Sequence, residues 1–232
     1  MDKRKLASDL EQGSAVLSLI EPATGGLMSM VGSVLNKAIL AAERRRQIWW
    51  RYVVENKTDE QFERALEYEL NEEHGDVILE GLRAALGTID NAALAPLGRL
   101  TRMYLLTKTG ARDRFFRSCI RLLSDVSVDE LEQIRRLVVW TLNVGEHEKF
   151  RLLQRDGNVQ YLIHQEGSDK DGSLHNSFEF DATHVFELFA DYSLLRPTTV
   201  GYHDLDLPQI VATRTVFMKL RHILTGYEGE RA

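Results

Sequence analysis

The feature that most constrains the fold of this chain is a change of hydrophobic period after residue 145. From residue 27 to about residue 142, apolar residues recur every three or four positions and strong helix formers dominate. This spacing places apolar side chains on one face of a helix, so we predict six or seven helices there. After residue 145 the spacing becomes that of strands and turns. The pattern therefore predicts a helical part followed by a smaller part of mixed helices and strands.

Helix-start signals divide the first part into separate helices. Ser127 with Glu130, and Thr58 with Gln61, fit a capping box, in which the hydroxyl accepts a backbone N–H while the Glu or Gln side chain reaches back. Gly75 favours the end of a helix, because glycine is common just past one. The helices that we expect are Leu27 to Glu55, Thr58 to Gly75, Asp76 to Leu86, Asp90 to Leu106, Arg112 to Ser124, and one from the Ser127 cap to about Leu142.

The second part opens with a predicted β-hairpin. Asp156 and Gly157 lie between two apolar runs, and this dipeptide suits a two-residue type I′ turn because both turn residues need a positive φ. The turn sets the register and gives the hairpin one apolar face that must be covered. The predicted pairs are Gln154 with Val159, Leu152 with Tyr161, and Phe150 with Ile163.

After the hairpin we expect a polar loop, a helix, two strands and a last helix. Asp181 can cap the first of these helices, which ends before Pro197 because a residue preceding proline is pushed out of the helical region. The remaining elements are strands at Thr198 to His203 and Gln209 to Thr213, and a helix from Val216 to Leu224 that stops at Gly226.

The end of the chain resembles a bacterial protein family. A helix ends in ELFADYSLLRP, a strand pair follows, and then comes IVATRTVFMKLRHILTG, which resembles the latter part of a winged helix-turn-helix domain. The upstream segment RFFRSCIRLLSDVSVDELEQIRRL is similar to the one that joins the helical region to such a domain in Abi-alpha family proteins, which are associated with abortive infection and phage defence. The hairpin of residues 150 to 164 is an addition to a standard winged helix. The resemblance covers residues 112 to 226.

Together, period and resemblance predict a mostly α fold with two domains. The first is a helical bundle at residues 1–124, and the second is a smaller α+β, winged-helix-like domain at residues 125–232. The 232 residues are enough for each to bury a core.

Composition favours a cytoplasmic protein. The chain has 35 Asp and Glu against 29 Lys and Arg, a net charge of −6. Cys119 is the single cysteine, so no internal disulfide can form and a reducing compartment fits. Acidic residues interrupt the apolar stretch that follows the basic start, so we expect no secretory signal.

No sequence pattern predicts catalysis, a metal or a cofactor. The chain has no P-loop, nucleophile elbow or dinucleotide-binding glycine motif, and Cys119 lies among apolar neighbours, which suits a core position. Asp181, His184 and Glu187 share a helix face, but Asp181 suits a helix cap and His184 a surface position. We therefore expect a non-enzymatic interaction module with a protein partner or self-association, in the phage-defence context that the Abi-alpha resemblance implies.

A nucleic-acid-binding regulator is the first alternative. Residues 145–232 carry nine Lys and Arg against fourteen Asp and Glu, and residues 182–193, the helix that would enter a DNA groove, contain no Lys or Arg. Phosphate binding needs Lys and Arg side chains, so residues 145–232 are disfavoured as a nucleic-acid-binding surface. A basic stretch at residues 83–121 is the better candidate, although it could also ion-pair with the acidic stretch at residues 55–80. The candidate nucleic-acid-binding residues are Arg112, Arg114, Arg117 and Arg121, of which the last three are spaced to share a helix face.

A membrane-associated effector is the second alternative. Only Lys37 is charged between Pro22 and Ala42, and a cationic cluster and two tryptophans follow, an order typical of segments that contact a membrane surface. The same residues also suit a partner-binding groove, or a central bundle helix with Trp49 buried. The candidate partner- or membrane-binding residues are Arg44, Arg45, Arg46, Trp49 and Trp50.

Overall fold

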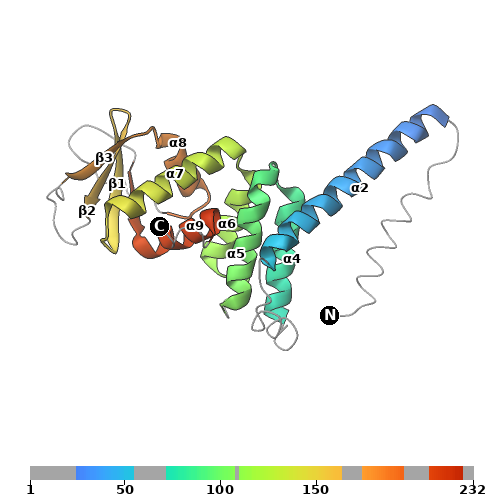
Figure 1. Cartoon of the computed structure of the whole chain (residues 1–232), viewed down its shortest axis with the longest axis horizontal. Helices are drawn as coiled ribbons and strands as arrows, with labels where there is room; N and C mark the ends of the chain where they lie inside the picture. The colour runs from blue at the N-terminus through green and yellow to red at the C-terminus, as the bar shows by residue number, and fades with distance from the viewer. Residues whose placement is uncertain (1–24, 55–71, 108–109, 164–173, 196–208, 227–232) are drawn as a thin grey trace. The chain divides into compact units, whose positions relative to one another are not determined.

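The computed structural model describes residues 25–54, 72–107, 110–163, 174–195 and 209–226 (Figure 1). The chain divides into two compact units, Met1–Arg45 and Arg46–Ala232. The described residues form seven α-helices and one four-stranded antiparallel sheet. The prediction of a mostly helical protein with a smaller α+β part is therefore confirmed. The domain boundary predicted after residue 124 falls in the last turn of helix α6 (Arg114–Asp125), inside the second unit, and stays a prediction.

The described part of the first unit is helical. Helix α2 spans Gly25–Val53, so it continues into the second unit, and the prediction of a helix over Leu27 to Glu55 is confirmed. Ile39 and Leu40 are exposed by 63% and 69%.

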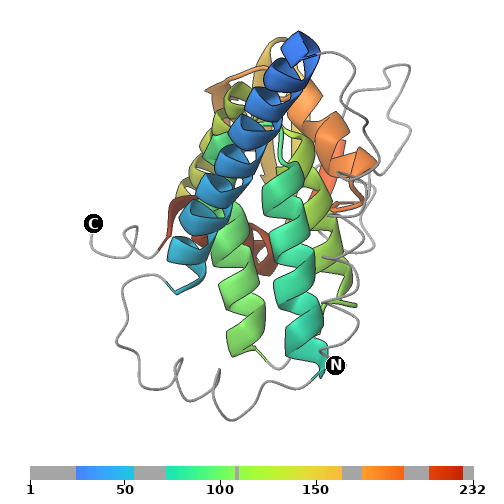
Figure 2. The same ribbon diagram turned by 90° about the vertical axis from the view of Figure 1, so that its right-hand side faces the viewer.

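Helix α7 of the second unit carries the cap chemistry that the sequence predicts. At the start of α7 the Glu130 N–H donates to Ser127 Oγ at 3.3 Å, and Glu130 Oε2 accepts from the Ser127 N–H at 2.7 Å, so the predicted capping box is confirmed. The Thr58 and Gln61 capping box lies outside the described residues. Helices α4 and α5 lie side by side (Figure 2). The helices are α4 (Glu72–Gly87), α5 (Leu94–Leu106, after the short 3₁₀ helix η2, Asn91–Ala93), α6 (Arg114–Asp125), α7 (Val128–Val144), α8 (Thr183–Asp191) and α9 (Arg214–Thr225).

One predicted helix boundary is wrong. Helix α4 passes through Gly75 without a break, whereas the sequence predicts a helix end there and a new start at Asp76. A glycine inside a helix costs only about 1 kcal/mol. Burial of Val77, Ala84 and Ala85 on the inner face of α4 outweighs that cost.

The sheet has the strand order β3-β2-β1-β4. Asp156 and Gly157 have φ values of 50° and 75°, and the pairs Phe150 with Ile163, Leu152 with Tyr161 and Gln154 with Val159 form as predicted. No strand is predicted from the sequence at β3, which follows the expected polar loop, and the predicted strand at 198–203 lies outside the described residues. The strands are β1 (Lys149–Arg155), β2 (Asn158–Ile163), β3 (Leu174–Glu179) and β4 (Gln209–Thr213).

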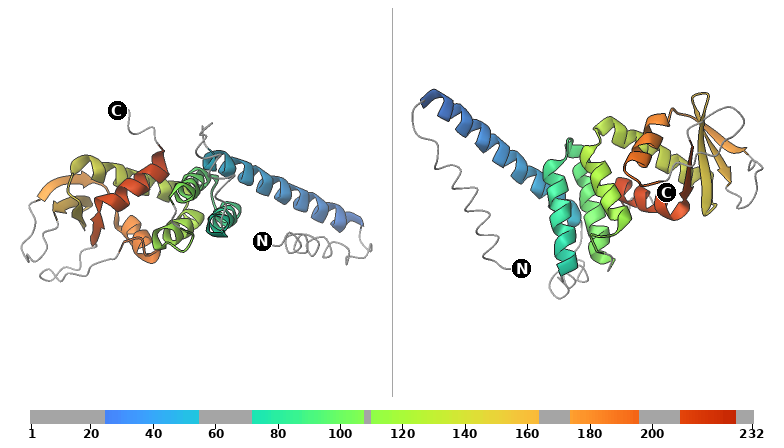
Figure 3. Two further views of the ribbon diagram at one scale, coloured as in Figure 1. Left: turned by 90° about the horizontal axis from the view of Figure 1, so that it is seen from below. Right: turned by 180° about the vertical axis from the view of Figure 1, so that it is seen from behind.

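The apolar face of the sheet is covered by helices. Phe217 of α9 is fully buried, and its ring centroid lies 5.2 Å from that of Phe150 in β1 and 6.3 Å from that of Phe189 in α8. Gln154 is buried at the same face, where its Oε1 accepts the Ala182 N–H at 2.8 Å and so fixes the start of α8. Helices α7 and α9 lie side by side (Figure 3). The sheet and the helices therefore share one continuous core.

Candidate functional site

The first turn of α6 is held in place by Asp113. Its Oδ1 accepts the Phe116 N–H at 3.0 Å and also the Tyr104 hydroxyl. Partial burial alone would raise the pKa of Asp113, but these two hydrogen bonds outweigh it and lower the pKa below the ordinary 3.8. Phe116 and Cys119 are buried on the inner face of α6. The helix is thus anchored, and its arginines are left on the outer surface.

One hollow beside α6 is an arginine-lined groove of about 500 Å³ between α4 and α6. Arg112, Arg117 and Arg121 border it together with Asp76 and Glu80. We call it the arginine groove. Its floor is made by Ala111, Phe116 and Ile120.

The three arginines of this groove take part in no ion pair that the described residues show. Arg117 Nε donates to the Ala111 carbonyl oxygen at 3.3 Å, and Glu80 is engaged at 2.8 Å by Arg83, one turn further along α4. Over the described ranges, Arg112, Arg117 and Arg121 form no ion pair with a carboxylate. Among the described residues, an anion entering the groove would therefore break no existing salt bridge.

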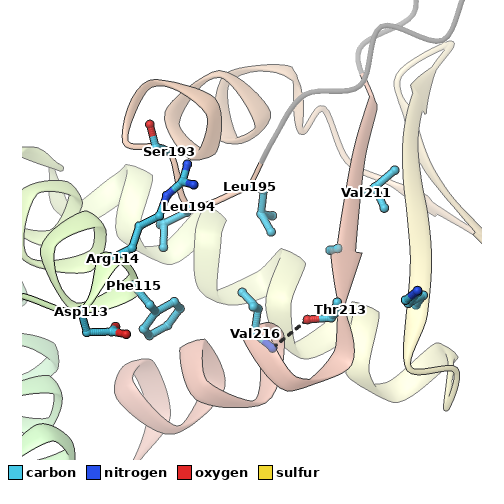
Figure 4. A pocket seen from close by; sticks show the side chains of 11 residues that line it. Asp113, Arg114, Phe115, Ser193, Leu194, Leu195, Val211, Thr213 and Val216 are labelled. Carbon is cyan, nitrogen blue, oxygen red and sulfur yellow. Dashed lines mark hydrogen bonds between the residues drawn. The ribbon is translucent and has the colours of Figure 1, made fainter. Parts of the chain in front are cut away.

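A second hollow lies on the other side of the α6 N-terminus and has a volume of about 640 Å³ (Figure 4). It is lined by Arg114 and Phe115 from the start of α6 and by three consecutive residues of β4, Val211–Thr213. We call it the β4-edge groove. The other lining residues are Asp113, Lys149, Ser193, Leu194, Leu195 and Val216.

The structure divides the four arginines proposed for nucleic-acid binding between these two grooves. All four are exposed. Arg112, Arg117 and Arg121 line the arginine groove, whereas Arg114 lines the β4-edge groove. The three residues that helical spacing predicts on one face, Arg114, Arg117 and Arg121, are therefore not the three that share a groove. Arg112 joins the groove from the turn before α6, which helical spacing does not describe.

The candidate partner- or membrane-binding residues do not lie in one unit. Arg44 and Arg45 belong to the first unit, and Arg46, Trp49 and Trp50 belong to the second. Trp49 is 2% exposed, while Trp50 is 39% exposed, and their ring centroids lie 5.8 Å apart. The arginines are exposed or half-buried. Of the two tryptophans, only Trp50 offers its ring to solvent.

A membrane span requires a helix that is both long and apolar. Among the described helices, none is long and apolar enough to cross a bilayer.

His184 lies in a network of carboxylates at the start of α7 and α8. Its Nε2 lies 2.7 Å from Glu130 Oε1 and its Nδ1 lies 3.6 Å from Glu187 Oε2. Asp181 Oδ1 accepts the Thr183 N–H at 3.0 Å, but the N-cap of α8 is Ala182, so the predicted cap at Asp181 is wrong by one residue. The hydrogen bond to Glu130 raises the pKa of His184 above 6.5, and the Ser127 N–H lowers the pKa of Glu130 to about 2. Within the described residues no group of three His, Cys, Asp or Glu side chains is arranged to hold a metal ion.

This network predicts a pH-dependent contribution to stability. Because the pKa of His184 is raised in the folded state, its contribution to the free energy of unfolding is complete below pH 6.5. That contribution is lost as the pH rises through the folded-state pKa. The Glu130 contribution is complete above pH 4.5 and is lost as the pH falls toward about 2. His184→Gln should therefore lower the free energy of unfolding by about 0.3–1 kcal/mol between these two limits, since the pair is partly exposed. Urea denaturation at a series of pH values measures this difference.

Glu187→Gln is the matched control, because the Glu187 contact is longer and more exposed. It should have a smaller effect at every pH. A difference between wild type and His184→Gln that does not change with pH would contradict the assigned pairing.

Cys119 does not contribute to either groove. It is 1% exposed, and burial raises the pKa of its thiol well above the ordinary value. It therefore packs as a small apolar side chain, as its sequence neighbours predict.

Three comparisons with known proteins give no match. No protein-family model, no curated protein and no solved structure matches this chain. The Abi-alpha resemblance therefore stays a prediction.

Sequence reasoning did not find the β4-edge groove. Its walls come from α6, the turn after α8, β1, β4 and α9, which are far apart along the chain. Only the Leu194-Leu195 step stands out in the sequence, and it marks the end of a helix rather than a binding site.

Proposed function

We propose that this protein is a non-enzymatic interaction module that binds the phosphate backbone of a nucleic acid through the arginine groove. The observation that carries the proposal is the set of three exposed arginines at one groove that form no ion pair within the described residues. The role in bacterial phage defence is part of the proposal and is supported by the Abi-alpha resemblance of residues 112 to 226.

The chemistry of the groove supports a phosphate ligand. A guanidinium group presents two parallel N–H donors that match two phosphate oxygens. Arg117 and Arg121 are one helical turn apart on α6, so both can face the same backbone. Of the two carboxylates that line the groove, Glu80 is paired with Arg83 and Asp76 is not. The three arginines therefore outnumber the one carboxylate that faces them. Phosphate binding driven by such arginines is independent of base sequence.

The charges of the two helices favour contact with the nucleic acid through α6 rather than through α8. We retain the winged-helix-like arrangement of residues 125–232 as a proposal, supported by the order α7, α8, β4, α9. Helix α8 holds the position of a recognition helix in that order, but it carries Glu187 and no Lys or Arg. A negatively charged helix is repelled by phosphates. The module therefore differs from a conventional winged helix in where it meets its partner.

A salt titration of nucleic-acid binding tests this proposal. The full chain is titrated against a fluorescein-labelled DNA duplex and, separately, a single-stranded RNA, from about 50 to 200 mM salt, with anisotropy as the readout. Arg117→Gln with Arg121→Gln should weaken binding roughly 100-fold, about tenfold for each charged hydrogen-bonding group. The slope of log affinity against log salt should fall by about 1 for each phosphate that the variant no longer neutralises.

Arg135→Gln is the matched control for charge. Arg135 is an exposed arginine of α7 that pairs with Glu132 at 3.5 Å, outside either groove. It should weaken binding less than Arg121→Gln, although the net charge changes equally. Equal losses, or no binding of the wild type to either probe at low salt, would show that the proposal is wrong.

A further inference from the structure

The hydrogen-bonding pattern between β1 and β4 shows which backbone N–H and C=O groups of β4 point away from β1, toward the open edge of the sheet. The Arg214 N–H donates to the Glu148 carbonyl oxygen at 2.7 Å, and hydrogen-bonded pairs alternate along an antiparallel ladder. Phe150 with Ala212 and Leu152 with Ile210 are therefore the hydrogen-bonded pairs between β1 and β4. The two-residue turn at the other end of β1 leads to the same assignment. Arg155 and Asn158 flank this turn as a hydrogen-bonded pair, and the alternation counted from them along β1 gives the same result.

It follows that Val211 directs its backbone N–H and C=O away from β1. The strand order is β3-β2-β1-β4, so that side of β4 is an edge of the sheet among the described strands. Neither backbone group of Val211 has a hydrogen-bond partner in the described part of the chain. Unpaired groups of this kind are a template for another strand.

The β4-edge groove runs along this edge. Successive residues of a strand point to opposite faces, so a hollow lined by Val211, Ala212 and Thr213 in a row must follow the strand's edge. The opposite wall is apolar and is formed by Phe115, the Leu194-Leu195 step and Val216 (Figure 4). Backbone groups on one wall and apolar side chains on the other are what an extended peptide requires.

The charges of the groove select the kind of peptide. Arg114 and Lys149 line it, and the one carboxylate there, Asp113, is engaged by the Tyr104 hydroxyl and the Phe116 N–H. Lys219 lies next to the groove, with its Nζ 5.4 Å from the centroid of the Phe115 ring. The potential in the groove is therefore positive and favours an acidic occupant.

We propose that the β4-edge groove binds an extended acidic segment of a partner protein, which pairs with β4 as an added strand. The peptide backbone bonds the N–H and C=O of Val211, and one apolar side chain packs between Leu195 and Val216. Its carboxylates face Arg114 and Lys149. This site is separate from the arginine groove, so the two proposals stand or fall independently.

Peptide binding and amide exchange test the inference together. The probes are eight-residue peptides in which glutamate alternates with valine, isoleucine, leucine or phenylalanine, titrated against the isotope-labelled full chain. We expect saturable binding of at least one peptide, with the Val211 amide proton becoming protected from exchange. Peptides with lysine in place of glutamate should bind at least roughly tenfold more weakly. Methylation of alternate backbone nitrogens should abolish binding, because it removes the donors of the added strand.

Two protein variants locate the site. Val211→Pro removes only the outward N–H, which edge strands tolerate, and should abolish binding. Arg114→Glu changes an exposed side chain and should weaken binding of the acidic peptides at least roughly tenfold, so the inference remains testable if the proline variant fails to fold.

Several outcomes would overturn the inference. These are no binding of any acidic peptide, equal binding of the methylated peptides, or no effect of Arg114→Glu. A Val211 amide that is already protected without peptide would show that the chain itself occupies the edge. Protection that grows with protein concentration would show that a second copy occupies it.

Discussion

Replacing Trp49 with alanine should lower the free energy of unfolding by about 3–5 kcal/mol. The indole is 2% exposed and belongs to the main core, where a Cβ placed on Gly81 of α4 would lie 3.1 Å from its ring. Removing it leaves a cavity between α2 and α4 that small neighbours cannot fill. Guanidinium denaturation followed by circular dichroism measures the change.

Trp50→Ala is the matched control, since it removes the same side chain one residue further along α2. Trp50 is 39% exposed, so its removal should cost about 1 kcal/mol, mostly the contact between the two rings. Trp49→Phe should fall between the two, because it keeps an aromatic ring and removes an indole N–H that has no partner in the described part of the chain. Equal costs for the two alanine variants would contradict the assignment of Trp49 to the core.

Gly98→Ala should lower the free energy of unfolding by about 1–3 kcal/mol, even though alanine is the better helix former. A Cβ at position 98 would lie 2.5 Å from the Tyr52 Cβ and 2.7 Å from the Trp49 carbonyl oxygen. The second of these atoms is backbone and cannot rotate away. Helix α5 and the end of α2 must separate to accept the methyl group, which strains a packed core. Chemical denaturation measures this change as well.

Gly75→Ala is its control within the same unit. Gly75 lies inside α4, and a Cβ there meets no atom within 4 Å. The same substitution should therefore raise the free energy of unfolding by about 0.5–1 kcal/mol through helix propensity. If both variants change stability in the same direction, the close approach at Gly98 is not the cause.

The elements predicted correctly are those whose chemistry is local. The capping box at the start of α7 needs only Ser127 and Glu130, three residues apart. The hairpin needs only Asp156 and Gly157, which determine the turn and therefore every pair between β1 and β2. Such signals are complete within a few residues, so they can be read without knowledge of the rest of the chain.

The predictions that failed or were incomplete depend on distant contacts. Gly75 has the local character of a helix end, yet packing of the inner face of α4 carries the helix through it. Helical spacing places Arg114 with Arg117 and Arg121, but the grooves on either side of α6 separate Arg114 from the other two. Which side of a helix becomes a binding surface depends on the neighbouring elements, and periodicity does not contain that information.

By itself, the sequence determined the helical first part, the hairpin register and the presence of exposed arginines around residues 112–121, because propensity, turn chemistry and charge are properties of short segments. Only the tertiary structure decided that Trp49 is a core residue, that three arginines line one groove, and that Val211 lines the same hollow as the apolar Phe115, Leu195 and Val216. Each of these depends on segments that are distant in the chain and adjacent in space, and that adjacency is created by burial of the shared core.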